Sequence, residues 1–322
     1  MSPDLPPALR RAIDREMAGV SRQTMAERTA ATTTAYRAGG TSASTIRGRD
    51  DALAYALARL PATYAACAAV FSEAMRRAPG FQPTSLLDAG CGPGGGSWAA
   101  REAWGSLRDV VWLDASPPFL DLAQRLAAEA PLANASVQRG DLVAGEFPRA
   151  DLVLASYALA EIAPVAQRAV VTHLWAACDG VLAIVEPGTP AGYQRILSAR
   201  DSLIAGGATI LAPCPHHGVC PLTAPDWCHF SVRLARSRDH RLAKGAEVLF
   251  EDEKFAYLLA ARPQVVAEPR QPRVLARPRA GKPGIELKLC GLDGLETCFV
   301  GKRDKPRHAI ARRLDWGDVW PK

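Results

Sequence analysis

The sequence predicts an α/β protein built on a doubly wound parallel sheet. Between residues 84 and 190, short apolar segments alternate with segments whose apolar residues recur at helical spacing, a pattern typical of successive β-α units. Four of the apolar segments end in Gly, Asp or Ser, and open α/β sheets bind their ligands at such strand ends. With 48% hydrophobic and 22% charged residues, the chain has the composition of a protein with a sizeable core.

Five strands are expected in this part of the chain, at residues 85–90, 110–116, 135–141, 150–158 and 180–188. Helices are expected between them, among others at residues 117–130 and 166–179. Strands that alternate with helices run parallel, and the helices cover both faces of the sheet.

The chain before the sheet is predicted to be helical. Residues 50–80 carry apolar residues at helical spacing, and the run ends at a glycine. Pro61 lies inside this run, and we expect it to kink the helix or split it in two, because proline has no backbone N–H to donate. These Ala-rich stretches have one apolar face each and are expected to cap the following domain.

After residue 190 the alternation stops. We expect a cysteine-containing loop at 211–230, a strand at 253–262, a Pro- and Arg-rich linker at 262–284 and a final hairpin at 285–303. The expected organisation is an N-terminal helical region (1–78), a cofactor-binding domain (79–205), a Cys-rich metal-binding region with its following strand (206–262) and a basic linker with a C-terminal β-hairpin (263–322).

Composition also limits the compartment and the partners. No run of eighteen apolar residues occurs, so we expect no membrane-spanning helix and no membrane partner. The first residues lack the apolar block of a signal peptide, which predicts a cytoplasmic protein, or a mitochondrial matrix protein in a eukaryote. The sequence does not give the oligomeric state, and a monomer is the expectation. Eight cysteines in such a compartment favour metal binding over disulfides.

Positive charge is concentrated at the C-terminal end. The chain carries a net charge of +6, yet residues 262–322 alone contain 14 Lys and Arg against 7 Asp and Glu. This asymmetry favours a nucleic-acid partner, with a solvated basic surface as the alternative. The residues concerned include Arg270, Arg273, Arg277, Arg279, Lys302, Arg303 and Lys305. Trp316 and Trp320 could stack on bases there, but we expect them to seal the hairpin.

A glycine-rich loop follows the first predicted strand. Gly90, Gly92 and Gly94 lie between a strand and a helix, where the backbone must turn sharply and approach a ligand closely. Glycines alone would also fit a dinucleotide site. Asp88, two residues before the first glycine, resembles instead the first motif of class I S-adenosylmethionine-dependent methyltransferases. In that superfamily the acid and the glycines position the methionine part of the cofactor.

Two more acids are expected at the same edge of the sheet. Asp114 ends the second strand, where a carboxylate can accept hydrogen bonds from both hydroxyls of a ribose. Asp141 ends the third strand, where the superfamily contacts the adenine amino group. Three carboxylates suit a neutral nucleoside on a cationic sulfonium and would repel a phosphate. The alternative is that these acids only cap helices.

The fourth strand lacks the Asn/Asp-Pro-Pro-aromatic motif of enzymes that methylate amino groups, and it lacks the cysteine of those that attack cytosine C5. Tyr157 could stack on a base and Glu161 could accept a proton, but both residue types also pack or cap at a helix start. No catalytic residue is identified from the sequence.

Three cysteines lie close together after the sheet. Cys214, Cys220 and Cys228 lack the tight pairs of zinc ribbons, and proline follows the first two, as in some iron–sulfur loops. A fourth thiolate could come from Cys290 or Cys298. An iron–sulfur cluster is favoured, with a mixed zinc site that uses His216, His217 or His229 and unligated cysteines as alternatives. The other three, Cys67, Cys91 and Cys178, are expected to be small buried residues.

Taken together, the chain resembles the small-ribosomal-subunit Rsm family of methyltransferase-like proteins, which serve mitochondrial ribosome assembly and also occur in bacteria. The resemblance rests on "LARLPATYAA", "SLLDAGCGPG", "VVWLDAS", "CPHHGVCPL", "DWCHFSVRLAR", "EDEKFAYLLAAR", "KRD" and "WGDVW". It implies a class I methyltransferase fold and a 4Fe–4S cluster on Cys214, Cys220, Cys228 and Cys290. It also implies binding to small-subunit rRNA, without methylation in part of the family.

These observations predict an S-adenosylmethionine-binding, iron–sulfur-containing protein that acts on the small ribosomal subunit and supports translation. The leading hypothesis is an rRNA methyltransferase. The alternatives are a non-catalytic rRNA-binding assembly factor and a zinc-containing small-molecule methyltransferase.

Overall fold

The structure, a computed structural model, describes residues 3–37, 41–128, 132 and 134–321. The strands of the main sheet are β1 (Ser85–Ala89), β2 (Asp109–Asp114), β3 (Ser136–Arg139), β4 (Ala150–Ser156), β5 (Cys178–Pro187), β6 (Thr209–Ala212), β7 (Phe230–Ala235) and β8 (Phe250–Ala261). The helices are α1 (Pro7–Glu16), α2 (Arg22–Arg37), α3 (Ser42–Thr45), α4 (Arg49–Arg77), α5 (Gly95–Ala103), α6 (Pro117–Ala127), α7 (Pro164–Ala177), α8 (Pro190–Ala205), α9 (Arg238–Lys244) and α10 (Lys305–Ala311). A small second sheet contains β9 (Arg273–Val274), β10 (Arg279–Ala280), β11 (Gly284–Cys290) and β12 (Leu295–Gly301).

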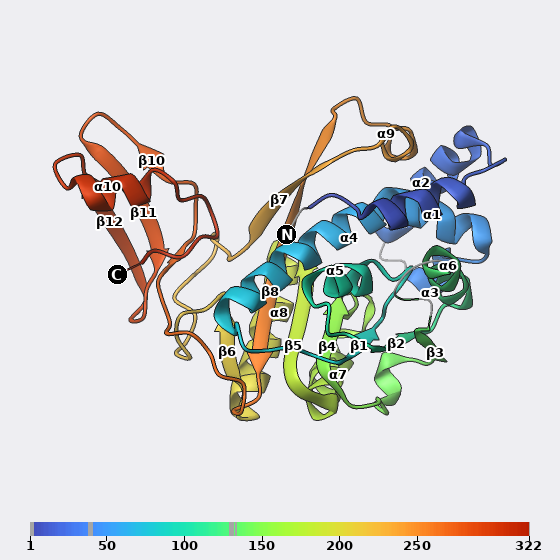
Figure 1. Cartoon of the computed structure of the whole chain (residues 1–322), viewed down its shortest axis with the longest axis horizontal. Helices are drawn as coiled ribbons and strands as arrows, with labels where there is room; N and C mark the ends of the chain where they lie inside the picture. Colours follow the sequence, from blue (N-terminus) through green and yellow to red (C-terminus); the bar gives the residue numbers. More distant parts are fainter. Residues whose placement is uncertain (1–2, 38–40, 129–131, 133, 322) are drawn as a thin grey trace.

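The main sheet is mixed, with the strand order β3-β2-β1-β4-β5-β8-β6 and β7 paired to β8. The five predicted strands are confirmed as β1 to β5, and they run parallel. β8 pairs antiparallel with β5, β6 and β7. This is the doubly wound, Rossmann-like α/β fold that the sequence predicts, with an N-terminal helical region (Figure 1).

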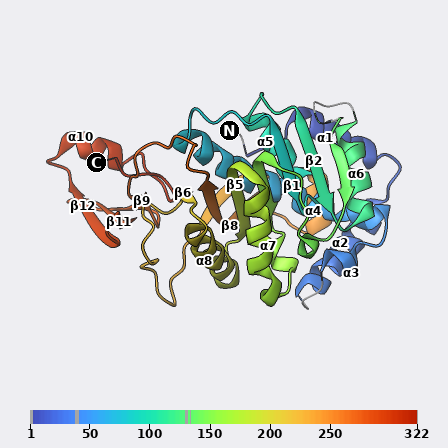
Figure 2. The same ribbon diagram turned by 90° about the horizontal axis from the view of Figure 1, so that it is seen from below.

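The core lies in two layers, one on each face of the sheet. Alternate residues of a strand point to opposite faces, so Leu86 and Leu152 lie in the layer under α4, α5 and α6, while Leu87 and Val153 face α7 and α8 (Figure 2). Proline occupies the first turn of α6, α7 and α8, where its missing N–H leaves no bond unmade. The sheet is therefore covered on both sides, and its ligand-binding edge stays open.

Three expectations about the order of the elements change. Helix α4 is not split at Pro61, one of the two outcomes expected there, because its residues pack on both sides of the proline and stabilise the helix beyond the one lost hydrogen bond. The alternation also continues one unit further than expected, with α8 and then β6 following β5. The helix predicted at 117–130 ends at Ala127, and residues 129 and 130 lie outside the described part of the chain.

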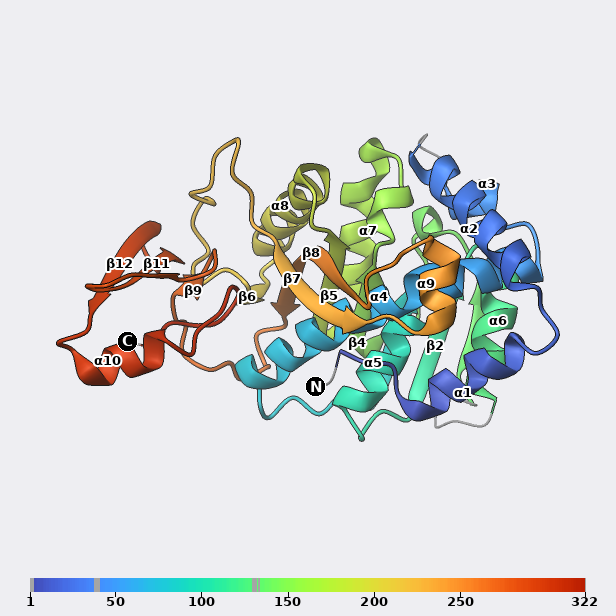
Figure 3. The same cartoon turned by 90° about the horizontal axis from the view of Figure 1, so that it is seen from above.

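In the described ranges, α4 is the one helix that is long and apolar enough to cross a membrane by length and composition. However, 78% of its apolar window is buried inside the protein. It packs against α2, α5, α9 and β8, as Figure 3 shows from above. This burial is that of a core helix.

Residues 273–321, here called the C-terminal lobe, form the small sheet and α10 at one end of the molecule (Figure 1). The lobe has a core of its own, formed by Val274, Ile285, Leu287, Leu289, Val300, Ala311 and Trp320. The expected linker is thus partly structured, since β9 and β10 both pair with β11. Trp320 is buried in this core, as expected of a residue that seals the hairpin.

A buried ion pair joins the lobe to α4. Nη2 of Arg273 lies 2.5 Å from Oε1 of Glu73, and both side chains are almost fully buried, at 3% and 4% exposure. Burial alone would raise the pKa of Glu73, but the charge and hydrogen bond of Arg273 hold this pKa below its usual value. Arg77, one turn further along α4, donates to the backbone oxygens of Glu268 and Pro269 and so holds the preceding connection.

We expect Arg273→Met to lower the free energy of unfolding by about 3–5 kcal/mol, because Glu73 would be left buried without its partner. Arg76→Met is the matched control, since Arg76 also contacts Glu73 but is 51% exposed. Its loss should cost less than about 1 kcal/mol. Urea unfolding of the two variants and the parent protein measures both values. Equal losses would show that the buried pair does not stabilise the junction.

Candidate functional site

The glycine loop follows β1 and turns into α5. Gly90, Gly92 and Gly94 all adopt positive φ, at 74°, 53° and 83°, a region that side chains other than glycine rarely enter. A Cβ on Gly90 would also lie 2.8 Å from Cβ of Ala158, which follows β4. Backbone conformation therefore favours glycine at all three positions, and space restricts Gly90 as well. Gly94 precedes the first residue of α5 and starts that helix.

A cavity of about 200 Å³ opens beside this loop, at the carboxyl ends of β1, β2 and β4. The strand order reverses between β1 and β4, and this is the crevice in which open α/β sheets bind ligands. Of the six residues predicted to bind a cofactor, four line the cavity: Gly90, Gly92, Asp114 and Asp141. The other two, Asp88 and Gly94, do not line it.

Asp88 lies beneath the glycine loop, with no exposed surface. Its Oδ2 accepts a hydrogen bond of 2.6 Å from the Ser97 hydroxyl, and Ser97 Oγ accepts one of 2.9 Å from Trp112 Nε1. Burial raises the pKa of Asp88 to about 7. The side chain points toward α5, so in this structure Asp88 supports the loop from behind and is no wall of the cavity.

Asp114 connects the ends of two strands. Its Oδ2 accepts from the Gly92 amide and its Oδ1 accepts from the Ser116 amide, both at 2.8 Å. Burial raises its pKa, and these backbone hydrogen bonds oppose the rise. Each oxygen uses one acceptor site in this way and keeps another, because a carboxylate has about four such sites. Asp114 both shapes the loop and presents acceptors at the cavity.

Asp141 combines a capping role with a place in the wall. Its Oδ1 accepts a 2.9 Å hydrogen bond from the Val143 amide and caps the short 3₁₀ turn Leu142–Ala144. The capping role that the sequence left open is thus present, although the residue also lines the cavity. Together with Asp114 and Glu161 it makes the wall acidic. No Lys or Arg is found among the described residues of this wall.

Tyr157 and Glu161, the two residues considered for chemistry, both have structural partners. Tyr157 has a φ of 58°, unique among the described non-glycine residues, and its hydroxyl donates a 2.8 Å hydrogen bond to Glu253 on β8. Arg59 of α4 lies 3.6 Å from the same Glu253 carboxylate. Glu161 accepts from the amide and hydroxyl of Ser42, at 2.9 and 2.5 Å. The N-terminal region therefore closes one side of the cavity, which the sequence did not predict.

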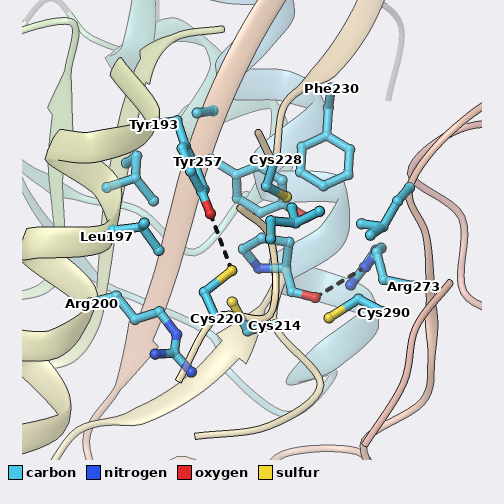
Figure 4. A pocket seen from close by; sticks show the side chains of 15 residues that line it. Tyr193, Leu197, Arg200, Cys214, Cys220, Cys228, Phe230, Tyr257, Arg273 and Cys290 are labelled. Carbon is cyan, nitrogen blue, oxygen red and sulfur yellow. Dashed lines mark hydrogen bonds between the residues drawn. The ribbon is translucent and has the colours of Figure 1, made fainter. Parts of the chain in front are cut away.

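The second site is a pocket between the main sheet and the C-terminal lobe. Cys214 follows β6, Cys220 lies in the loop, Cys228 precedes β7 and Cys290 ends β11, and all four line this pocket (Figure 4). Cys220 Sγ is 3.2 Å from the Tyr193 hydroxyl, and Cys290 Sγ is 3.6 Å from His216 Nε2. Three segments that are distant in sequence thus meet at these thiols.

Cys298, the other candidate for the fourth thiol, lies elsewhere. It is opposite Leu287 in the β11–β12 ladder and packs against the core of the C-terminal lobe. Adjacent strands place facing residues on one side of the sheet, so Cys298 and Cys290 point to opposite faces. In the structure, therefore, Cys290 lines the pocket and Cys298 does not.

Two buried arginines form part of the same wall. Arg200 is 1% exposed, and its Nη2 donates to the backbone oxygens of His216 and Gly218 at 2.9 and 2.7 Å. Its Nε is buried and has no hydrogen-bond partner. Its carboxylate contact, Asp201 at 3.4 Å, is 76% exposed. Arg273 donates from Nε to Pro213 O, next to Cys214, at 3.3 Å (Figure 4). The sequence did not indicate a site role for Arg200. Arg273, which was expected on an RNA-binding surface, is buried instead.

Burial raises the pKa values of the Cys214, Cys228 and Cys290 thiols, that of Cys290 to about 12, and neighbouring cysteines add to the rise. Across the described part of the chain, no three His, Cys, Asp or Glu side chains are arranged to hold a single metal ion. His217 Nε2 accepts from the Ile210 amide at 3.0 Å, and its neighbour at 2.7 Å is Arg270 Nη2. His229 stacks on Trp227. Cys67, Cys91 and Cys178 are buried, as expected.

Comparison with known proteins gives a family match. Residues 49–321 match the family described as "Mitochondrial small ribosomal subunit Rsm22". The human protein named "Ribosome assembly protein METTL17, mitochondrial" is 32% identical over 297 residues, which cover 84% of this chain and 62% of the relative. "Rsm22-cox11 tandem protein 2, mitochondrial" of Schizosaccharomyces pombe is 27% identical over 323 residues, covering 84% of this chain and 43% of the relative. The chain thus spans less than two thirds of the length of either relative.

Among solved structures, the magnesium protoporphyrin IX methyltransferase of Synechocystis with bound SAH is 17% identical. The similarity covers 62% of this chain and 83% of that one, with a TM-score of 0.42.

Proposed function

The chain belongs to the Rsm22 family, and on this basis we propose that it is an assembly factor of the small ribosomal subunit that binds S-adenosylmethionine and a 4Fe–4S cluster. The observation that carries the proposal is the pocket of four cysteines, which joins a methyltransferase-like fold to a basic C-terminal lobe. The relatives are mitochondrial by name. We propose the mitochondrial matrix for this chain in a eukaryotic host and the cytosol in a bacterium.

The acidic cavity supports S-adenosylmethionine as the first cofactor. Asp114 and Asp141 provide acceptors at the ends of β2 and β3, and Gly90 and Gly92 allow a ligand to approach the backbone. A wall with three carboxylates and no described cation suits a positively charged sulfonium and disfavours the phosphates of a dinucleotide. When bound, the cofactor would supply an activated methyl group. The residues of this chain would bind and orient it.

We expect Asp114→Ala to weaken binding of S-adenosylmethionine by about 1.5–3 kcal/mol, the range for hydrogen bonds to a charged group. Asp109→Ala is the matched control, because Asp109 is the exposed residue at the opposite end of β2, away from the cavity. Isothermal titration calorimetry of both variants measures the effect, with thermal unfolding as a check on the fold. Absence of binding by the parent protein would disprove this part of the proposal.

The cysteine pocket supports a cluster as the second cofactor. Four thiols and no carboxylate line it, and soft thiolates select iron–sulfur clusters, copper(I) and zinc. The buried Nε of Arg200 has no hydrogen-bond acceptor, and the one carboxylate that Arg200 contacts, Asp201, is exposed, so an anionic group in the pocket would stabilise this guanidinium. A thiolate-bound cluster would supply that negative charge. A zinc site remains the alternative, and it would require all ligands to converge on one ion.

We expect the protein, purified without oxygen, to be brown and to contain iron and inorganic sulfide in equal amounts. Cys290→Ser should lose most of the visible absorption, because Cys290 lines the pocket. Cys298→Ser, on the same hairpin but facing the lobe core, should keep it. If the purified protein contains one zinc per chain and no sulfide, the pocket holds zinc and the cluster proposal is wrong. If Cys298→Ser loses the visible absorption and Cys290→Ser keeps it, the fourth ligand is Cys298.

Methyl transfer to rRNA is a second candidate function, favoured by the cavity at the strand ends. Against it stands the end of β4, where Tyr157, Glu253 and Arg59 are bound to one another at the place where a catalytic motif would be expected. We propose that subunit assembly is the primary role. Whether the protein also transfers a methyl group to rRNA is tested separately below.

To test the proposed function, the protein would be incubated with immature and mature small subunits and S-adenosylmethionine labelled in its methyl group. We expect it to co-sediment with immature subunits in preference to mature ones, because an assembly factor must leave the finished particle. Equal or no binding would contradict the assembly role. Label found in the rRNA would add methyl transfer, and mapping would then give the nucleotide.

A further inference from the structure

One face of the C-terminal sheet carries an exposed aromatic ring. Residues of β11 and β12 alternate between the lobe core and the outer face, and Phe299 lies on the outer face opposite Glu286. Its side chain is 58% exposed, and Leu295, two pairs along the same face, is 45% exposed. A phenylalanine with so much exposed surface contributes little to the core of its own lobe.

The ring is nevertheless held in place by the backbone beneath it. A Cβ on Gly284 would lie 2.8 Å from Cζ of Phe299, so the ring packs directly over this glycine. Gly301, paired with Gly284 across the ladder, also leaves space beside the ring. Phe299 therefore covers the glycines with one side and leaves the other to solvent. A ring that is already fixed loses little conformational freedom when a planar group stacks on it.

Basic side chains lie on the same face of the sheet as this ring. Arg279 pairs with Glu286 across the sheet, in the same row as Phe299. A groove of about 310 Å³ lies beside the ring, and three cations, Arg277, Arg279 and Lys288, line it together with two carboxylates, Glu286 and Glu296. Phe299 itself does not line the groove, but its cross-strand neighbour Glu286 does. Arg279 contacts Glu286 at 3.5 Å and Lys288 contacts Asp226, all with exposed side chains. Exposed pairs of this kind are weak, so both cations remain available to a phosphate.

We propose that this surface binds an unpaired stretch of RNA, with a base stacked on Phe299 and the backbone phosphates along Arg277, Arg279 and Lys288. This proposal rests on the proposed function. It adds the surface that contacts the RNA and the form of RNA, unpaired, that this surface binds.

The chemistry of the face selects this ligand. An aromatic ring on a sheet surface, flanked by cations, is the general means by which proteins bind single-stranded nucleic acid. In a duplex the bases are already stacked on one another and offer no free planar face. Two exposed apolar side chains among charged ones form too small an apolar patch for a stable protein interface. The 14 basic against 7 acidic residues from Arg262 onward favour a polyanion.

The test uses the whole protein, purified without oxygen. Its affinity is measured by fluorescence anisotropy for a single-stranded oligoribonucleotide and for a duplex of the same sequence, over a series of salt concentrations. The variants are Phe299→Ala, Phe299→Leu and Phe299→Trp. Leucine keeps an apolar cover over Gly284 without an aromatic face, and tryptophan keeps the aromatic face. Phe250→Ala is the matched control, because Phe250 is a 41% exposed phenylalanine on β8 with Arg233 over its ring.

We expect both Phe299→Ala and Phe299→Leu to lower the affinity for single-stranded RNA by about 5- to 100-fold, the range for one base–aromatic stack. Affinity for the duplex should be unchanged, and Phe299→Trp and Phe250→Ala should both bind as the parent does. The dependence on salt should also stay the same in the Phe299 variants. In Arg277→Gln and in Arg279→Gln, the slope of log affinity against log salt concentration should become shallower by about 0.7 per lost phosphate contact.

Three results would overturn the inference while leaving the proposed function in place. The first is equal single-strand affinity of Phe299→Leu and the parent. The second is an equal loss for single strand and duplex. The third is a Phe299→Ala variant that binds the oligoribonucleotide as the parent does but no longer co-sediments with immature subunits. That result would show that the face contacts a ribosomal protein. If the parent binds neither RNA nor immature subunits, the proposed function itself fails.

Discussion

The guanidinium of Arg273 is the contact on which the arrangement of the molecule depends. It pairs with Glu73 of α4, donates to the backbone of Pro213 beside Cys214 and donates to the backbone of Gly317 in the C-terminal lobe. A buried charge is stable only while its partners stay in place, so this one side chain fixes three segments relative to one another. Cys290 reaches the other three cysteines because the lobe is held in this position.

The two ends of the molecule offer opposite chemistry. The cavity at the strand ends has an acidic wall and is closed on one side by the N-terminal region, whereas the exposed face of the C-terminal lobe carries Arg277, Arg279 and Lys288. The cysteine pocket lies between the main sheet and the lobe and is lined by residues from both. In the proposed function, one end binds a small cationic cofactor, the other binds RNA, and the pocket sets the geometry between them.

Features encoded by local sequence could be predicted from it. The five parallel strands follow from apolar segments in regular alternation, and the glycine loop follows from backbone conformations that only glycine adopts easily. Features that depend on distant contacts could not. The insertion of β8 between β5 and β6, the continuity of α4 through Pro61, the inward direction of Asp88 and the place of Arg200 in the cysteine pocket all depend on packing. The sequence shows the residue types in these cases but not their neighbours.

In the proposed function, a cluster bound in the cysteine pocket fixes the C-terminal lobe to the main sheet. Backbone hydrogen exchange, compared before and after removal of the metal from the anaerobically purified protein, tests this claim most directly. We expect faster exchange in β11 (Gly284–Cys290) and in the loop at 211–230 after removal, with β1 and β4 unchanged. The same exchange rates in both forms would contradict this claim.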